Sequence, residues 1–446
     1  MTTFKIGGVH PHDNKIYSAH KPITRVELPK QAIVPLSQHI GAPAVAIVQK
    51  GDKVKVGQLI AQAGGFVSAP VHAPVSGTVL KIDTAVDAWG MKMPAIYINV
   101  EGDDWDESID RSDKLNPVCR LQPKEIVEKI QNAGIVGLGG ACFPTHVKLT
   151  PPPGKKAEVL IVNGVECEPY LTCDHQLMLE HSEEIMIGIE ILMKALGIDK
   201  TIIGIEKNKP DAIEVMDRLA SRHMGVSVMP LNLKYPQGGE KQLIDACIGR
   251  QVPSGALPIE VGAVVDNVAT IFAVYEAVQK NKPLIERVIT VTGKDVKNPG
   301  NFIVRFGTPL SQVLDVAGGI PAGTGKIIGG GPMMGRAMSN VDMPTNKRVS
   351  GVLLLPEDES VRREPQNCIR CAKCVQACPM GLEPYLLAKQ AERGMWDEME
   401  KNAIMDCIEC GCCLFTCPSY RPLLDYVRMG KAKVGGILRA RAASKK

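Results

Sequence analysis

The residues with the clearest chemistry are cysteines, of which the chain has 14 in 446 residues. Eight of them form two runs with the same spacing, C-x-x-C-x-x-C-x-x-x-C-P, the first starting at Cys368 and the second at Cys407. Three thiolates at positions i, i+3 and i+6 can wrap one face of a cuboidal cluster, and soft thiolate ligands suit iron with bridging sulfide. The two runs therefore predict two [4Fe-4S] clusters.

This spacing is the two-cluster bacterial ferredoxin pattern, in which the fourth cysteine of each run binds the other cluster. The first cluster is expected on Cys368, Cys371, Cys374 and Cys417, and the second on Cys407, Cys410, Cys413 and Cys378. Zinc is the alternative, but it normally takes two separated pairs of ligands and leaves a third closely spaced cysteine unused. Cys412 is an additional thiol inside the second run and is expected to be a bystander. Such clusters exchange single electrons, so the chain needs an exchange partner such as a flavin.

A glycine-rich segment, AGIVGLGGACFPTHVKL, offers a site for such a partner. Glycines at 137, 139 and 140 would let backbone N–H groups approach a phosphate, and the ring of Phe143 could stack on a flat heterocycle. The segment does not match the dinucleotide fingerprint G-x-G-x-x-G, because Cys142 stands at the third glycine.

Three further motifs follow in order: NGVECEPY from Asn163, YPQGGEK from Tyr235 and DNVAT from Asp266. With the glycine loop, they resemble the FMN and NADH site of the flavoprotein subunit of respiratory NADH dehydrogenase. The resemblance implies that Gly139, Gly140 and Lys148 bind the FMN phosphate or the nucleotide and that Phe143 stacks on NADH. It also implies that Asn163, Glu166 and Glu168 face the flavin. The complete implied site is Gly137, Gly139, Gly140, Phe143, Lys148, Asn163, Glu166, Glu168, Tyr235, Gly238, Glu240, Asn267 and Thr270. Val165 and Gly239 replace acidic residues of the respiratory pattern, while Cys142, Cys167 and Cys173 are expected to be buried thiols.

The elements around these motifs predict a multidomain α/β and α+β chain. Short apolar runs between glycine turns predict a barrel-sandwich hybrid at 1–115, similar to lipoyl and biotinyl domains but without a lysine at the expected hairpin tip, Gly65–Ser68. Alternating strands and helices predict a Rossmann-like flavin and NADH domain at 116–284. A segment resembling the SLBB β-grasp module is expected at 285–350, a linker at 351–366, a helical two-cluster ferredoxin domain at 367–426 and a basic tail at 427–446.

This order of modules resembles the RnfC subunit of the Rnf electron-transport complex (the RnfC/RsxC family). The resemblance implies a peripheral subunit on the cytoplasmic face of the cell membrane, bound to integral membrane and iron–sulfur subunits. It implies electron exchange between NAD(H), FMN and the clusters, in a complex that couples ferredoxin and NAD chemistry to ion movement, so that ferredoxin is an indirect partner. No export signal or transmembrane run is visible, and the net charge of +4 gives no case for nucleic-acid binding.

Two alternatives stay open from the sequence. One is a soluble cobalamin reductase, whose relatives share the flavin and cluster modules but begin near the flavin motif. The other is a non-catalytic electron relay or scaffold with a degenerate nucleotide pocket, for which Val165 and Cys142 are the reason.

Overall fold

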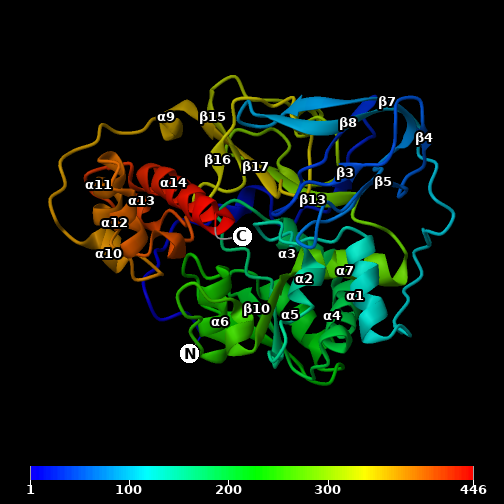
Figure 1. Cartoon of the computed structure of the whole chain (residues 1–446), viewed down its shortest axis with the longest axis horizontal. Helices are drawn as coiled ribbons and strands as arrows, with labels where there is room; N and C mark the ends of the chain where they lie inside the picture. Colours follow the sequence, from blue (N-terminus) through cyan, green and yellow to red (C-terminus); the bar gives the residue numbers. More distant parts are fainter. Residues whose placement is uncertain (1, 445–446) are drawn as a thin grey trace.

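The computed structural model describes residues 2–444. Figure 1 shows an α/β domain on one side of the molecule, with the N-terminal barrel and a second mixed domain above it. The cysteine-rich helices form a separate group beside both. The expected multidomain fold class and the order of its modules are confirmed.

The α/β domain is built on four parallel strands in the order β11-β10-β9-β12. These strands are β9 (Val159–Asn163), β10 (Thr201–Glu206), β11 (Val226–Leu231) and β12 (Ala263–Asn267). The chain runs from β9 to β10 and β11 on one side of β9, and then crosses to β12 on the other side. The strand order therefore reverses at β9. A crevice for a ligand is expected beyond the carboxyl ends of two such strands.

Helices cover both faces of this sheet, and continuous apolar runs bury its strands, as is usual for parallel sheets. They are α1 (Pro123–Asn132), α2 (Thr145–Lys148), α3 (Cys173–Glu180), α4 (Ser182–Leu196), α5 (Pro210–Ala220), α6 (Glu240–Ile248), the 3₁₀ turn η2 (Pro258–Val261) and α7 (Val268–Gln279).

The barrel consists of two small antiparallel sheets, β2-β8-β7-β4 and β3-β5-β6. Alternate residues such as Val34, Ile60, Ile96 and Ile98 are fully buried between the sheets. Its strands are β2 (Gln31–Pro35), β3 (Val45–Ala46), β4 (Lys53–Val54), β5 (Leu59–Gln62), β6 (Val71–His72), β7 (Ser76–Val86) and β8 (Lys92–Gly102).

The second mixed domain contains a six-stranded sheet in the order β1-β14-β13-β17-β15-β16. Its strands are β1 (Thr24–Arg25), β13 (Glu286–Thr292), β14 (Gly300–Arg305), β15 (Thr324–Gly329), β16 (Arg336–Ala337) and β17 (Gly351–Pro356), with helices α8 (Leu310–Val316) and α9 (Glu357–Ser360). The prediction of a linker at 351–366 is wrong in its first part. Residues 351–356 form a central strand, because the apolar run Val352 to Leu354 is buried between β13 and β15.

The cysteine-rich domain is helical. It contains α10 (Lys373–Gln376), α11 (Pro384–Glu392), α12 (Trp396–Lys401), η3 (Ile404–Asp406), α13 (Cys412–Phe415) and α14 (Leu423–Ala443). The predicted basic tail at 427–446 is largely the helix α14, because Val427 and Val434 are buried against this domain and Arg441 pairs with Glu400. The last two residues of that predicted tail lie outside the described part of the chain.

Residues 2–9, here called the strap, lie between the α/β domain and the cysteine-rich domain, before the 3₁₀ turn η1 (Lys15–Tyr17). Thr2 O accepts from Asn232 N at 2.8 Å, Val9 pairs with Tyr235, and Gly8 N donates to Ala377 O at 3.0 Å. The strap therefore joins the two domains. Among residues 2–444, no helix has the length and apolar character needed to cross a bilayer.

Candidate electron-transfer site

The two cysteine runs fold into loops with the same backbone conformation. Arg370 and Glu409 both have φ 57°, and the equivalent next positions, Ala372 and Gly411, have φ 58° and 81°. Left-handed residues at matching places turn each loop tightly on itself, so that its first three thiols can face one centre. Each loop thus has the tight turns that the spacing predicted, and the set of cluster ligands stays a prediction.

The thiols predicted to bind the second cluster, here called the inner cradle, line one cavity together. They are Cys378, Cys407, Cys410 and Cys413, and the rest of the wall is apolar, including Leu382, Leu387, Leu424 and Val427. Backbone N–H groups of Leu382 and Glu409 donate to Cys378 Sγ and Cys407 Sγ, each at 3.4 Å. Burial raises the pKa of Cys407 to about 11, so the protein alone disfavours the thiolate that a metal would stabilise. Four sulfur donors in an apolar shell fit an iron–sulfur cluster.

The thiols predicted for the first cluster, here called the outer cradle, lie nearer solvent. Cys368 and Cys371 are exposed, whereas Cys374 and Cys417 are partly buried. Burial raises the pKa of Cys374, and the charge of Cys417 adds to the shift. The grouping of these four thiols around one cluster stays a prediction.

The inner cradle is seated on the α/β domain. Tyr235 Oη donates to Cys410 O at 2.9 Å, and Tyr235 is buried in an apolar cluster with Val9, Ala377 and Cys412. Cys412 Sγ points to Tyr235 O at 3.8 Å and is fully buried. The additional thiol therefore lies in this contact, and it also borders the inner cavity.

At the carboxyl ends of β9 and β12, Asn163 and Asn267 lie opposite each other in register. Asn163 Nδ2 donates to Gly238 O at 2.9 Å, and Asn267 Nδ2 donates to Asn163 O at 3.3 Å. Asn267 Oδ1 accepts from Ala269 N at 2.9 Å and caps α7. Three predicted site residues from different motifs thus meet at the topological switch point of the sheet.

The glycine loop lies against this strand end. A Cβ at Gly139 would come within 2.8 Å of Asn267 Cβ, whereas one at Gly140 would meet nothing within 4 Å. Thr270 Oγ1 accepts from Leu138 N at 2.8 Å, and Gly137 N donates to Phe143 O at 2.8 Å. The loop is held at both ends, and its exposed glycine backbone forms a cradle that a phosphate would fit.

Lys148 reaches the same crevice from α2. Its Nζ donates to Val265 O at 2.8 Å and lies 3.4 Å from Glu240 Oε1 and 3.8 Å from Asp266 Oδ1. The Asp266 side chain is completely buried, neither of its oxygens has a hydrogen-bond partner, and burial raises its pKa to about 6. A buried carboxyl at a strand end that lacks a hydrogen-bond partner is a group that a bound ligand could satisfy. Sequence reasoning missed Asp266, although it directly precedes Asn267.

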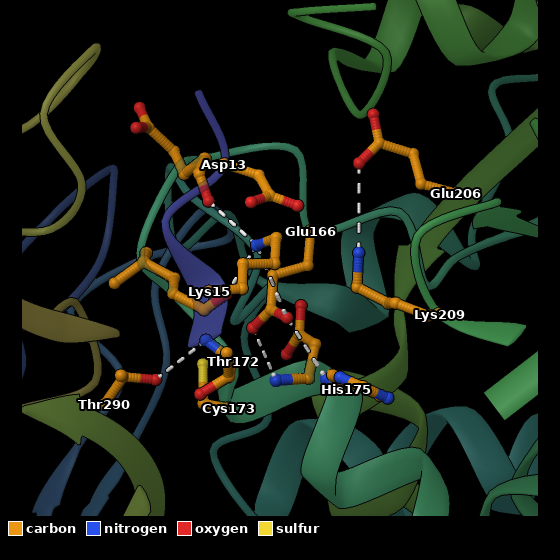
Figure 2. Close-up of polar contacts among 12 residues, drawn as sticks. Asp13, Lys15, Glu166, Thr172, Cys173, His175, Glu206, Lys209 and Thr290 are labelled. Carbon is orange, nitrogen blue, oxygen red and sulfur yellow. Dashed lines mark hydrogen bonds and ion pairs between the residues drawn. The ribbon is translucent and has the colours of Figure 1, made fainter. Parts of the chain in front are cut away.

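The two glutamates of the NGVECEPY motif are bound within the protein. Glu166 has φ 46°, and its carboxylate accepts from the backbone of Asp174 at 2.7 Å and of His175 at 3.3 Å, with Lys15 Nζ at 4.0 Å. Figure 2 shows this network beside the separate Glu206–Lys209 pair. Glu166 therefore fixes the start of α3 directly below the crevice.

The Glu168 side chain extends from the α/β domain to the second mixed domain. Its carboxylate accepts from Met334 N at 2.7 Å and Met333 N at 3.2 Å, in the segment between β15 and β16, and burial raises its pKa to about 7. Tyr235 Oη lies 3.4 Å from Glu168 Oε1. Both glutamates were predicted to face the flavin; the structure gives each an internal partner, and a direct flavin contact stays a prediction.

Asp174 is a second residue that sequence reasoning missed. Its Oδ2 accepts from Asn267 Nδ2 at 2.6 Å, and burial followed by the charge of Glu166 raises its pKa to about 7. The only signal in the sequence was a carboxylate in the first turn after the NGVECEPY motif. Its effect depends on a contact with a residue 93 positions away, which no local pattern reveals.

A thiol-lined cavity, packed on an α/β domain whose strand ends bring the flavin motifs together, defines an iron–sulfur flavoprotein of the electron-transferring class. Four family models match the chain in order: the RnfC barrel sandwich hybrid domain over residues 2–103, the Nuo51 FMN-binding domain over 130–276, the SLBB domain over 288–337 and the 4Fe-4S dicluster domain over 360–418. The predicted cofactors, FMN and two [4Fe-4S] clusters, agree with these domains.

Similar proteins are found over nearly the whole chain. A subunit of the proton-translocating ferredoxin:NAD(+) oxidoreductase complex of Clostridium ljungdahlii is 46% identical over 96% of this chain and 93% of its own length. Its counterpart in the Na(+)-translocating complex of Acetobacterium woodii is 44% identical over 97% of both chains. A subunit of the ion-translocating oxidoreductase complex of Rhodobacter capsulatus is 41% identical over 97% of this chain and 84% of its own. The chain belongs to the RnfC family, whose members are subunits of ion-translocating oxidoreductase complexes.

Proposed function

We propose that this chain is the NAD(H)-linked electron-transfer subunit of an ion-translocating ferredoxin:NAD oxidoreductase complex. In this proposal it binds FMN and NAD(H) at the ends of β9 and β12 and passes electrons through its two clusters. Partners are integral membrane and iron–sulfur subunits, with the chain held peripherally at the cytoplasmic face of the membrane. The observation that carries the proposal is the contact of the inner cradle with Tyr235, which belongs to the same YPQGGEK motif as Gly238, the residue that bonds to Asn163 at the strand end.

The proposed binding role of each site residue follows from its chemistry and its position. Bound FMN supplies exchange between the two-electron chemistry of a nicotinamide and the one-electron chemistry of iron–sulfur clusters. The exposed backbone at Gly139 and Gly140 is suited to a phosphate, and Lys148 adds a positive charge close to it. Hydrogen bonds join Asn163 to Gly238 and Asn267 to Asn163, and Thr270 Oγ1 accepts from Leu138 N of the glycine loop, so these residues hold the loop and the strand ends together.

The acidic residues set the charge of the crevice. Asp266 and Asp174 have raised pKa values, about 6 and about 7, because burial disfavours their ionised forms. Lys148 stands between Glu240 and Asp266 and offsets their charge. Phe143, half-buried beside the loop, remains the candidate for stacking on NADH.

The test is an anaerobic titration of the purified holoprotein with NADH, followed by visible and EPR spectra. Bleaching of FMN followed by reduction of both clusters is expected. Clusters that dithionite reduces in a protein that lacks FMN and ignores NADH would instead identify a non-catalytic relay. Transfer of the electrons to a corrin would identify a cobalamin reductase.

A matched pair of glycine variants locates the FMN site. Gly139→Ala should reduce FMN content, because its Cβ would collide with Asn267. Gly323→Ala is the control, since Gly323 is exposed and an added Cβ there meets nothing within 4 Å. Equal FMN content in the two variants would place the cofactor elsewhere.

A further inference from the structure

A large aromatic side chain stands exposed on the barrel hairpin between β5 and β6. Phe66 is 66% exposed, although the backbone around it is tightly held. Ser68 Oγ accepts from Gly64 N at 2.9 Å and donates to Ala42 O at 2.8 Å, and Ala42 N donates to Val67 O at 3.0 Å. The hairpin tip thus holds Phe66 in place while leaving its ring in water, so the ring forgoes the burial that an aromatic side chain normally gains.

This tip rests on the end of the glycine loop. His146 Nε2 donates to Phe66 O at 3.2 Å, and the two rings meet edge to face with centroids 6.1 Å apart. A second contact joins Ile40 N to Cys142 O at 3.3 Å. The barrel is therefore attached to the loop that is proposed to bind nucleotide, through residues on either side of Phe143.

The short helix α2 connects the hairpin tip that carries Phe66 to the ends of the strands. His146, on α2, contacts the hairpin tip, while Lys148, two residues later, reaches Asp266 at the strand end. A dinucleotide that places its nicotinamide at the strand ends must carry its adenine a whole nucleotide further away. Gly140, whose surroundings are open, belongs to the loop that separates the strand end from the hairpin tip.

Phe143 of the glycine loop is half-buried and is already assigned to stacking on NADH. Outside the cysteine-rich domain, the described phenylalanine, tyrosine and tryptophan residues that are strongly exposed are Phe66 and Trp89. Trp89 lies against the guanidinium of Arg336, with the cation 5.7 Å from its ring. Phe66 is therefore the exposed aromatic surface next to the glycine loop.

We propose that Phe66 of the barrel forms an adenine-stacking wall of the NAD(H) site. This inference rests on the proposed function and assigns to the barrel a direct part in substrate binding. It also gives the hairpin tip a role, since the tip has no lysine to carry a lipoyl or biotinyl group. An exposed flat ring suits a purine, which binds through its face rather than by hydrogen bonds.

The test compares NADH with reduced nicotinamide mononucleotide, which has the same reacting ring but no adenine. Stopped-flow reduction of FMN in the anaerobic holoprotein gives the half-saturating concentration for each. Phe66→Ala should raise that concentration for NADH about 5- to 100-fold, the range of a lost base-stacking contact, and should change it much less for the mononucleotide. Phe66→Trp should restore NADH binding.

Ile47→Ala is the control, because Ile47 is a comparably exposed apolar residue of the same barrel, at 48%. FMN content and the dithionite-reduced EPR spectrum verify that each variant is intact. Unchanged NADH saturation in Phe66→Ala, an equal loss for both substrates, or a defect only in binding other subunits would each overturn the inference. Wild-type protein that ignores NADH would instead overturn the proposed function, so the two failures are distinguishable.

Discussion

The inner and outer cradles share one motif and one backbone conformation but differ in their surroundings. The inner cavity is closed by apolar side chains and sits on Tyr235, whereas two of the outer thiols and the neighbouring Ile369 are exposed. The same spacing thus gives two loops of the same conformation, and the packing around each loop makes one buried and the other exposed. In the proposed function the inner cluster faces the flavin and the outer one faces a partner.

Cysteine substitutions should give the largest difference in behaviour between the two cradles. Cys410→Ser should remove the inner cluster and abolish reduction of the outer one by NADH, because the connection to the crevice is lost. Cys371→Ser should remove the outer cluster but leave NADH able to reduce the inner one. Iron content and EPR spectra after NADH addition measure both; an outer cluster that NADH still reduces in Cys410→Ser would reverse the proposed order.

The packing under the cradles should show the next largest difference. Val434 of α14 is fully buried, so Val434→Asp should destabilise the cysteine-rich domain by about 3–5 kcal/mol. Ile369, beside the outer thiols, is 67% exposed, and Ile369→Asp should change stability by no more than about 0.5 kcal/mol. Anaerobic thermal unfolding followed by cluster absorbance distinguishes them; similar losses would mean that the outer loop is covered.

The folding stability of the protein should depend on pH through Glu168, which lies beside Tyr235 where the inner cradle packs on the α/β domain. Its pKa is about 7 in the folded protein, above the ordinary 4.5, because burial favours the neutral form. The folded state therefore binds the extra proton between these values, so stability falls as pH rises from about 4.5 to 7, by on the order of 3 kcal/mol at most. Glu168→Gln should flatten this change in melting temperature between pH 5 and pH 8. Asp425, in an exposed pair with Arg362, is the control, and Asp425→Asn should keep the wild-type slope.

Two tyrosines offer the smallest and most specific comparison. Tyr235→Phe removes the hydrogen bond to Cys410 O and should cost about 1 kcal/mol, together with slower cluster reduction by NADH. Tyr420 bonds to the exposed Arg363 on the cysteine-rich domain, and Tyr420→Phe should have little effect. Rapid-mixing kinetics at the cluster absorbance give the rates. Equal rates in both variants would show that the Tyr235 contact does not aid transfer.

Some of this architecture was readable in the sequence because it is encoded locally. The cysteine spacing fixes the turns at Arg370 and Glu409, and the alternation of strands and helices predicted the Rossmann-like domain to which β9 and β10 belong. The structure also brings the glycine loop close to the DNVAT motif, since a Cβ at Gly139 would come within 2.8 Å of Asn267 Cβ; their joint role in binding stays a prediction.

Other features depended on distant partners and were not predictable from local patterns. Val352 to Leu354 look like a short apolar piece after a loop, and only pairing with β13 and β15 makes them a central strand. Glu168 finds its amides 165 positions away, in a turn between strands of another domain. The basic residues of α14 hid the buried stripe of Val427 and Val434, because charge dominated the composition of that segment.

Because the strap is at the start of the chain, the surface on which the cysteine-rich domain packs is synthesised before that domain. The surface that receives Ala377 and Cys410 is made of the strap, Tyr235 and Met333, all of which leave the ribosome before Cys368 does. Domains generally fold as units in the order of their synthesis. This surface of the strap, Tyr235 and Met333 can thus be folded before the cysteine runs are synthesised. Iron–sulfur clusters can then be inserted while the cysteine-rich domain packs against the rest of the protein.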